Sequence, residues 1–188
     1  LDIGGDAGST CGIPVGEECP NIPDRGFEMI YGDHQNIYIG YSHIHNVKLP
    51  MKAQEVHDVI VEFNHFGPSW SKEAIRGSET INNWIVRNNK FVDNMVPSGA
   101  TGTSGTADIG VWAGSGFQGD NWEIYGNLFL DTRTNWIQHN DAIIKAGSVA
   151  TASFVSNWKV YNNVFAGIQG PQSSVRLIGG SNNLVYNN

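Results

Sequence analysis

The chain has 188 residues, enough for one domain with a hydrophobic core, and carries 11 Lys and Arg against 18 Asp and Glu, a formal charge of −7. Charged residues make up only 15%, whereas the chain holds 23 Gly and 20 Asn, a composition that excludes both a disordered and a helix-rich protein. No apolar run approaches the length of a membrane span, we expect no retained signal peptide, and the acidic balance argues against nucleic acid as a partner.

Residues 1–26 form a Gly- and Pro-rich segment, which we predict to cap the first coil of the fold. Cys11 and Cys19 lie eight residues apart within it, and a disulfide between them would order a stretch that has no periodicity of its own. Disulfides persist in oxidising compartments, so we expect a secreted or extracellular protein, with the periplasm as an alternative. Two unpaired thiols in a cytosolic protein are the other interpretation.

Beyond this segment one short pattern recurs: an apolar residue, two variable positions, Asn, one variable position and a large apolar residue. The copies are Ile39-Ser42-Ile44, Val61-Asn64-Phe66, Val86-Asn89-Phe91, Ile124-Asn127-Phe129 and Val160-Asn163-Phe165, with a last one from Val185 to Asn188. Successive Asn positions are 22, 25, 38, 36 and 25 residues apart. A unit this short has no room for a helix, and the differences in length between the units are confined to loops.

Each unit also holds a second strand-like segment before the motif, at 29–31, 51–53, 74–76, 109–111, 142–144 and 176–178. Parallel strands normally need a long crossover between them. Here each unit returns the chain to the same place by a full coil, so the coil itself is the crossover. We assign residues 27–188 to this coiled domain, and because the last motif stops at Asn188, a fragment of a longer coiled domain and continuation by another chain are both open as alternatives.

The N-W-x-I/V-x-x-N-x-F pattern with its Gly-rich turns resembles the right-handed parallel β-helices of the pectate-lyase-like kind over residues 27–188. The resemblance implies an all-β, single-stranded right-handed parallel β-helix of about six coils with an internal Asn ladder. Asn side chains tolerate bends and can satisfy buried backbone groups there. The ladder would hold Asn64, Asn89, Asn127, Asn163 and Asn188, and Ser42 would break it at the first coil.

Trp84, Trp122 and Trp158 are in phase with the inward Ile and Val positions, and coils about 4.8 Å apart bring equivalent residues into contact. We therefore predict a core stack of Trp, and a second stack beyond the bend from Ile44, Phe66, Phe91, Phe129 and Phe165. An exposed aromatic platform for sugar rings is the alternative for the Trp residues.

Three acids head the second strands of consecutive coils, Glu73, Asp108 and Asp141. Stacked carboxylates about 5 and 10 Å apart would bracket the separation of the two catalytic carboxylates in glycosidases. Like charges this close would raise the pKa of at least one acid, or would bind a cation such as calcium. Acids at strand starts can also merely cap turns.

Basic residues share the same strands, at Lys52, Lys72, Arg76, Lys145 and Arg176. A basic stripe on an acidic protein can bind an anionic polysaccharide. The family that the chain resembles includes chondroitinase B-like and alginate-lyase-like enzymes. The resemblance implies Lys72 or Lys145 as the base, Arg76 as the acid or carboxylate clamp, and calcium bound by the three acids. Simple surface ion pairs, such as Arg76 with Glu73, are the plainer interpretation.

Histidines offer a further constellation. His43 and His65 occupy the same outward position in adjacent coils, where stacked imidazoles could bind a metal or act as acid and base, unless they are merely solvated. His139 lies in a loop near the acids and could carry protons. Insertions at 92–107 and 130–140 enlarge these coils, and Trp112 and Trp136 are candidates for stacking on sugars.

These features predict an exported carbohydrate-active protein, a polysaccharide lyase that cleaves an acidic, uronate-containing polysaccharide by β-elimination, with Lys52, Arg176, Trp112 and Trp136 holding substrate. A glycoside hydrolase built on the stacked carboxylates is one alternative. A non-catalytic β-helix that binds glycans, or that associates end to end into filaments, is the other.

Overall fold

The computed structural model describes residues 1–4, 25–29, 32–69, 73–94, 96–97, 107–111, 119–132, 136–137, 142–147, 155–167 and 173–188. Every element in these segments is a strand. The described segments contain no helix with the length and apolarity that a membrane crossing requires.

Three parallel sheets of six strands form the walls of the molecule. Sheet A consists of β1 (Asp2–Gly4), β4 (His43–His45), β7 (His65–Phe66), β10 (Lys90–Val92), β14 (Leu128–Leu130) and β18 (Val164–Ala166). Sheet B consists of β2 (Arg25–Met29), β5 (Leu49–Gln54), β8 (Ile75–Ser78), β12 (Ile109–Val111), β16 (Ala142–Ala146) and β19 (Ser173–Leu177). Sheet C consists of β3 (His34–Gly40), β6 (Val56–Glu62), β9 (Trp84–Arg87), β13 (Trp122–Tyr125), β17 (Lys159–Tyr161) and β20 (Leu184–Tyr186).

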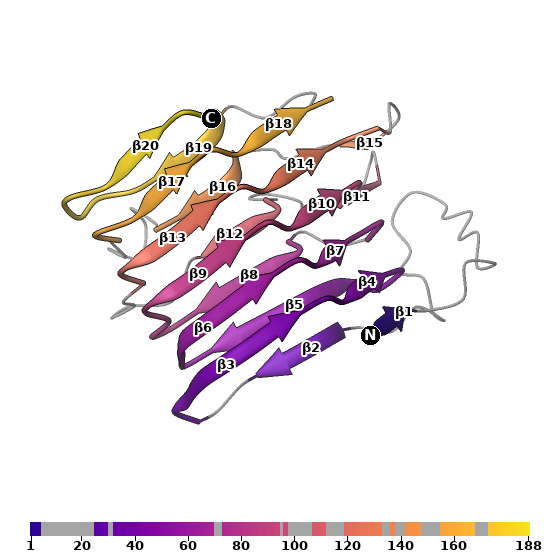
Figure 1. The fold of residues 1–188 in the computed structure, drawn as a ribbon, viewed down its shortest axis with the longest axis horizontal. Coiled ribbons are helices and arrows are strands. Elements are labelled where there is room, and N and C mark those ends of the chain that lie inside the picture. The colour runs from indigo at the N-terminus through magenta and orange to yellow at the C-terminus, as the bar shows by residue number, and fades with distance from the viewer. Residues whose placement is uncertain are drawn as a thin grey trace.

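The chain visits the sheets in the order B, C, A and then moves to the next coil, as Figure 1 shows from β2 and β3 at one end to β20 at the other. This path is the right-handed parallel β-helix of about six coils that the repeat predicts. The first and last strands of sheet B start upstream of the predicted segments at 29–31 and 176–178. The two strands outside the coils, β11 (Val96–Pro97) and β15 (Trp136–Ile137), pair antiparallel and come from the two predicted insertions.

The N-terminal residues contribute strands to the β-helix. β1 pairs in parallel with β4 in sheet A, and β2 pairs with β5 in sheet B. The predicted Cys11–Cys19 disulfide lies in residues 5–24, outside the described residues, as does most of the segment at 1–26 for which a cap is predicted.

The internal Asn ladder is confirmed. The side-chain amide of each Asn donates to the side-chain oxygen of the next, with distances of 3.1, 3.1, 3.0 and 2.9 Å along Asn64, Asn89, Asn127, Asn163 and Asn188. Each amide also donates to a backbone carbonyl one coil back, as Asn127 does to Val86 at 2.9 Å. Each side-chain oxygen accepts the preceding rung's backbone N–H, and Ser42 ends the ladder by donating its N–H to Asn64. The ladder thereby satisfies buried polar groups at the bend between sheets C and A.

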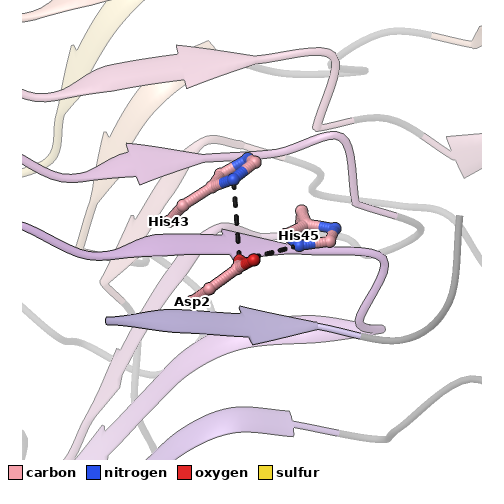
Figure 2. Close-up of side chains that lie close together, drawn as sticks. All are labelled: Asp2, His43 and His45. Carbon is pink, nitrogen blue, oxygen red and sulfur yellow. Dashed lines mark hydrogen bonds and ion pairs between the residues drawn. The ribbon is translucent and has the colours of Figure 1, made fainter.

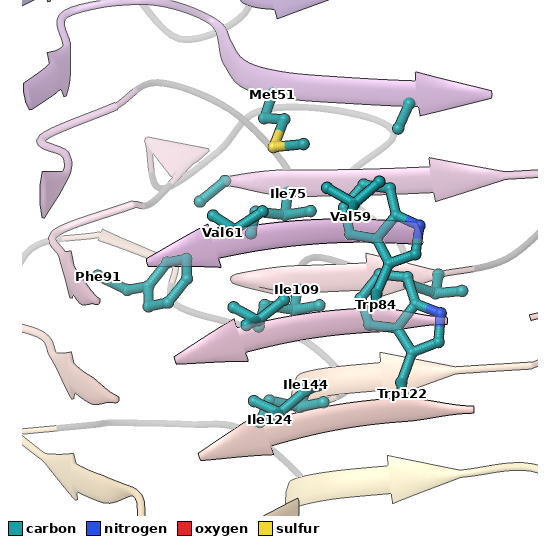
Figure 3. Packing of buried hydrophobic residues seen from close by; sticks show 14 of the residues in the cluster. Met51, Val59, Val61, Ile75, Trp84, Phe91, Ile109, Trp122, Ile124 and Ile144 are labelled. Atoms are coloured by element: carbon teal, nitrogen blue, oxygen red, sulfur yellow. The ribbon is translucent and has the colours of Figure 1, made fainter. Parts of the chain in front are cut away.

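The predicted Trp stack lies in the core. Trp84, Trp122 and Trp158 are fully buried, and their rings stack with centroids 4.7 and 4.8 Å apart. Figure 3 shows the first two of these rings, Trp84 and Trp122. Each indole N–H donates to a backbone carbonyl, of Val56, Ile81 and Gly119 in turn. The exposed platform for sugars is therefore not formed by these three residues. The Phe stack is also confirmed, through Phe66, Phe91, Phe129 and Phe165.

A second, exposed Asn ladder runs along the entry to sheet C. Asn83, Asn121, Asn157 and Asn182 donate amide to amide at 3.0, 3.0 and 3.2 Å. All four have φ between 58° and 62°, a left-handed conformation that Asn tolerates better than most residues. This explains the Asn that precedes each Trp of the repeat.

The last coil leaves apolar side chains exposed, with Leu184 at 53% and Val185 at 52%. Their counterparts one coil back are the exposed Lys159 and the buried Val160, so Val185 occupies an inward position. End-to-end association at this surface stays a prediction.

Candidate functional site

One row of side chains on sheet B carries the basic residues that the sequence predicts. The backbone register aligns Lys52 with Arg76, Arg76 with Gly110, Gly110 with Lys145, and Lys145 with Arg176. We call Lys52, Arg76, Lys145 and Arg176 the basic row. Neighbouring parallel strands lie about 4.8 Å apart, so the row extends over about 19 Å.

The basic row faces outward because side chains alternate along each strand. In β8 the neighbours of Arg76, Ile75 and Gly77, are buried, while Arg76 itself is partly exposed. Lys145 follows the same pattern between Ile144 and Ala146. These strands of sheet B thus point apolar residues inward and the cations of the basic row outward.

At its N-terminal end the row is partly neutralised. Lys52 donates to Glu28 of the neighbouring strand at 3.2 Å. No acidic residue occupies the row between Arg76 and Arg176, where its central member is Gly110. The two cations on either side of Gly110, Arg76 and Lys145, have backbones about 10 Å apart, since two strand spacings separate them.

Several predicted site residues lie outside the described residues: Lys72, Trp112, His139 and Asp141. Trp136 belongs to the described strand β15, which pairs with β11, but its side chain is not described. The basic row is therefore built only from residues within sheet B.

The predicted single row of acids is wrong for Glu73 and Asp108. Ile75 pairs with Ile109, and the backbone of Asp108 bonds to Ala74, Ile75 and Ile143. Asp108 therefore aligns with Ala74 and is one residue out of step with Glu73. The acid stands two positions before the aligned Ile in one coil and one position before it in the next, a shift that a repeat of unequal units hides.

Both acids are also enclosed, with Glu73 at 1% and Asp108 at 2% exposure. Burial raises the pKa of Asp108 well above its ordinary value, and the charges of Asp131 and Asp93 add to this while a hydrogen bond from Asn94 opposes it. Burial also raises the pKa of Asp131 to about 7, with a further contribution from Asp93. Asp108 and Asp131 are thus two enclosed acids between sheets A and B whose environment favours the protonated form.

The described residues do not assemble the predicted calcium site. Calcium takes six to eight oxygen ligands. Among the described His, Cys, Asp and Glu residues, the one group of three with ligand atoms within 4.8 Å of one another is Asp2, His43 and His45. Neither Glu73 nor Asp108 belongs to it, so we derive no step through calcium.

The predicted stacking of His43 and His65 is confirmed. The two residues are in register in adjacent coils, their ring centroids are 4.6 Å apart, and Lys90 follows in the third coil. Burial lowers the pKa of His65, and the neighbouring His43, Lys90 and His45 lower it further. His65 is therefore neutral at pH 7.

Asp2 and His45 join this cluster without having been predicted. His43 and His45 are two residues apart on β4, so the alternation of a strand places both on the outer face. That signal was available in the His-Ile-His sequence. Asp2 gave no comparable signal, because its place depends on β1 entering sheet A from far upstream.

The fold and the basic row define the protein as a right-handed parallel β-helix with a cationic outer face on one sheet. Comparison with known proteins finds no matching family model, no matching curated protein and no matching solved structure.

Proposed function

We propose that the protein is a carbohydrate-active β-helix of the pectate-lyase-like kind, which binds an acidic, uronate-containing polysaccharide along sheet B and cleaves it by β-elimination. The observation that carries the proposal is the in-register row of Lys52, Arg76, Lys145 and Arg176 on a protein of net charge −7. A line of cations separated by one or two strand spacings complements a polymer that carries a carboxylate on each repeating sugar.

The two cations beside Gly110 are suited to different tasks. Arg76 offers a planar guanidinium fork that can bind a carboxylate through two hydrogen bonds, so we assign it the role of clamping the uronate. A clamped carboxylate withdraws charge from the neighbouring C5 and stabilises the carbanion-like transition state.

Lys145 is assigned the role of general base. Its neutral amine takes the C5 proton, the C5–H electron pair forms the C4–C5 double bond, and the bond from C4 to the glycosidic oxygen breaks. The leaving oxygen is protonated by the lysine ammonium or by water, so protons and electrons balance. The products are one new chain end and one unsaturated uronate.

The enclosed positions of Glu73 and Asp108 do not favour the hydrolase alternative, because glycosidase carboxylates must reach both faces of a sugar. Calcium dependence, secretion and the sugar-stacking roles of Trp112 and Trp136 stay predictions of this proposal.

The test is incubation with alginate, pectate and chondroitin while the ultraviolet absorbance of the unsaturated uronate is followed, with calcium and then with EDTA. We expect a rise for one of these polymers, and a loss of about 10²-fold or more in rate for Lys145→Ala. Lys159→Ala is the matched control, because Lys159 lies on sheet C in an ion pair with Glu123. Binding without any absorbance rise would reduce the proposal to a glycan-binding β-helix, and absence of both would refute it.

A further inference from the structure

Three potential metal ligands lie close together on the outer face of sheet A, which points away from the core of the β-helix. β1 supplies Asp2, and β4 supplies His43 and His45 (Figure 2). Asp2 Oδ1 lies 2.9 Å from His45 Nε2 and 3.7 Å from His43 Nδ1. Tetrahedral Zn²⁺ with ligands at about 2.0–2.1 Å requires ligand atoms about 3.3 Å apart, so these separations bracket the required value.

The hydrogen bond of His43 selects the tautomer that a metal needs. His43 Nε2 lies 3.3 Å from the carbonyl oxygen of Gly67, which can only accept a hydrogen bond. Nε2 therefore carries the proton, and the lone pair of Nδ1 faces Asp2. A backbone carbonyl on the far ring nitrogen is the usual second support of a metal-bound His.

Gly67 itself is fixed in position. It has a φ of 119°, and a Cβ at this residue would lie 1.8 Å from the carbonyl oxygen of Val92. No other residue type fits this backbone, so the carbonyl that orients His43 is held by the fold.

His45 can present its Nε2 lone pair after a small local change. Without metal, Nε2 donates to Asp2, and Nδ1 lies 3.0 Å from the side-chain amide of Asn46. Rotation of that amide by half a turn places its oxygen against Nδ1, which can then carry the ring proton. A metal ion would replace the proton that His45 and Asp2 share.

The surroundings leave room for further ligands. Asp2, His43 and His65 line one surface hollow of about 740 Å³, beside the stacked and exposed rings of Tyr41 and Phe63. His65 stacks on His43 but does not belong to the group of three. Three protein ligands beside an open hollow are typical of metal sites that retain a water.

We propose that Asp2, His43 and His45 bind a divalent transition-metal ion such as Zn²⁺, with at least one position open to water. Two imidazoles and one carboxylate suit Zn²⁺ and its neighbours in the first transition row, whereas Ca²⁺ and Mg²⁺ prefer oxygen ligands. The site lies on sheet A and is independent of the proposed polysaccharide site on sheet B.

The test is calorimetric titration of the chelator-treated full chain with Zn²⁺. We expect one site per chain in the wild type and a loss of at least about 100-fold in affinity for His43→Ala/His45→Ala, given that even outer-shell partners cost 10–100-fold. His57→Ala is the control, because His57 also contacts two Asp side chains but belongs to no group of three such ligands among the residues that the structure describes. It should bind Zn²⁺ like the wild type.

A second readout uses Co²⁺, whose visible absorption reports the ligand geometry directly. Asp2→Asn should change this spectrum while circular dichroism shows an unchanged strand content. Equal Zn²⁺ affinity in the wild type and in the double His variant would overturn the proposal, as would the absence of Zn²⁺ binding to the wild type. Displacement of Zn²⁺ by millimolar Ca²⁺ would also contradict it.

Discussion

Two histidines of one coil lie in opposite electrostatic settings. His57, on β6, contacts Asp58 through Nδ1 at 2.7 Å and Asp33 through Nε2 at 2.6 Å. These hydrogen bonds, Asp58 first, raise the pKa of His57, and the bond from His57 is the main cause that lowers the pKa of Asp58. His65, on β7, has its pKa lowered chiefly by burial, and its Nε2 is buried without a hydrogen-bond partner.

NMR titration of the imidazole protons should therefore separate the two residues. We expect His57 to titrate above the ordinary value of about 6.5 and His65 below it. By linkage, the stabilisation from His57 is present below pH 6.5 and is lost as the pH rises through its folded pKa, whereas that from His65 is present above pH 6.5 and lost on acidification. Asp58→Asn should lower the pKa of His57 and leave His65 unchanged. A His65 that titrates above His57 would contradict this assignment.

At the scale of the element, the two Asn ladders differ in what they hold together. Asn127 is 2% exposed, and its side chain bonds Val86, Asn163 and Asn89. Asn121, in the outer ladder, is exposed and bonds mainly other side chains. Removal of the inner amide leaves buried backbone groups without a hydrogen-bond partner. Removal of the outer amide only exposes its partners to water.

Urea unfolding should show this difference. We expect Asn127→Ala to lower the free energy of unfolding by about 2–4 kcal/mol, because it leaves more than one buried polar group unpaired. Asn121→Gly, which keeps the left-handed backbone accessible, should cost less than about 1 kcal/mol. Equal losses in the two variants would show that the inner ladder does not stabilise the coils.

The elements that recur in consecutive coils could be predicted from the sequence. The Trp stack, the Phe stack and the inner Asn ladder each recur at the same position in consecutive units, and stacking of coils converts that recurrence into contact. The basic row was predictable for the same reason. The acids were not, because Asp108 departs from Glu73 by one residue, and a periodic pattern cannot fix register where single residues differ.

The cluster of Asp2, His43 and His45 also lay beyond prediction as a whole. The two His on β4 follow strand alternation, but Asp2 meets them only because β1 is the first strand of sheet A. Contacts that depend on how a chain end enters a sheet leave no periodic trace in the sequence.

At the scale of the whole molecule, the buried acids should govern how stability depends on pH. The pKa of Asp131 is raised to about 7 and burial raises that of Asp108 well above its ordinary value, so both hold protons in the folded protein that the unfolded chain releases near pH 4. The free energy of unfolding should therefore fall as the pH rises from about 4 through 7.

Urea midpoints measured between pH 4.5 and 8 test this expectation. Asp131→Asn should flatten the decline and stabilise the protein above pH 7, since the amide needs no proton to stay neutral. Glu55→Gln removes the same charge from an exposed position and should leave the slope unchanged. A wild-type protein whose stability rises across this pH range would contradict the raised pKa values of Asp108 and Asp131.

The basic row makes the whole outer face of sheet B a candidate surface for an anionic polymer, and its direct test is the affinity for uronan oligosaccharides of two charge-matched double variants. Arg76→Ala/Lys145→Ala removes two cations from the row, whereas Lys90→Ala/Lys159→Ala removes two from sheets A and C. We predict that the first variant loses at least about tenfold in affinity, equivalent to about 1.4 kcal/mol, with a weaker salt dependence, while the second binds like the wild type. Equal weakening by both variants would show that net charge alone governs binding, and would contradict the assignment of sheet B.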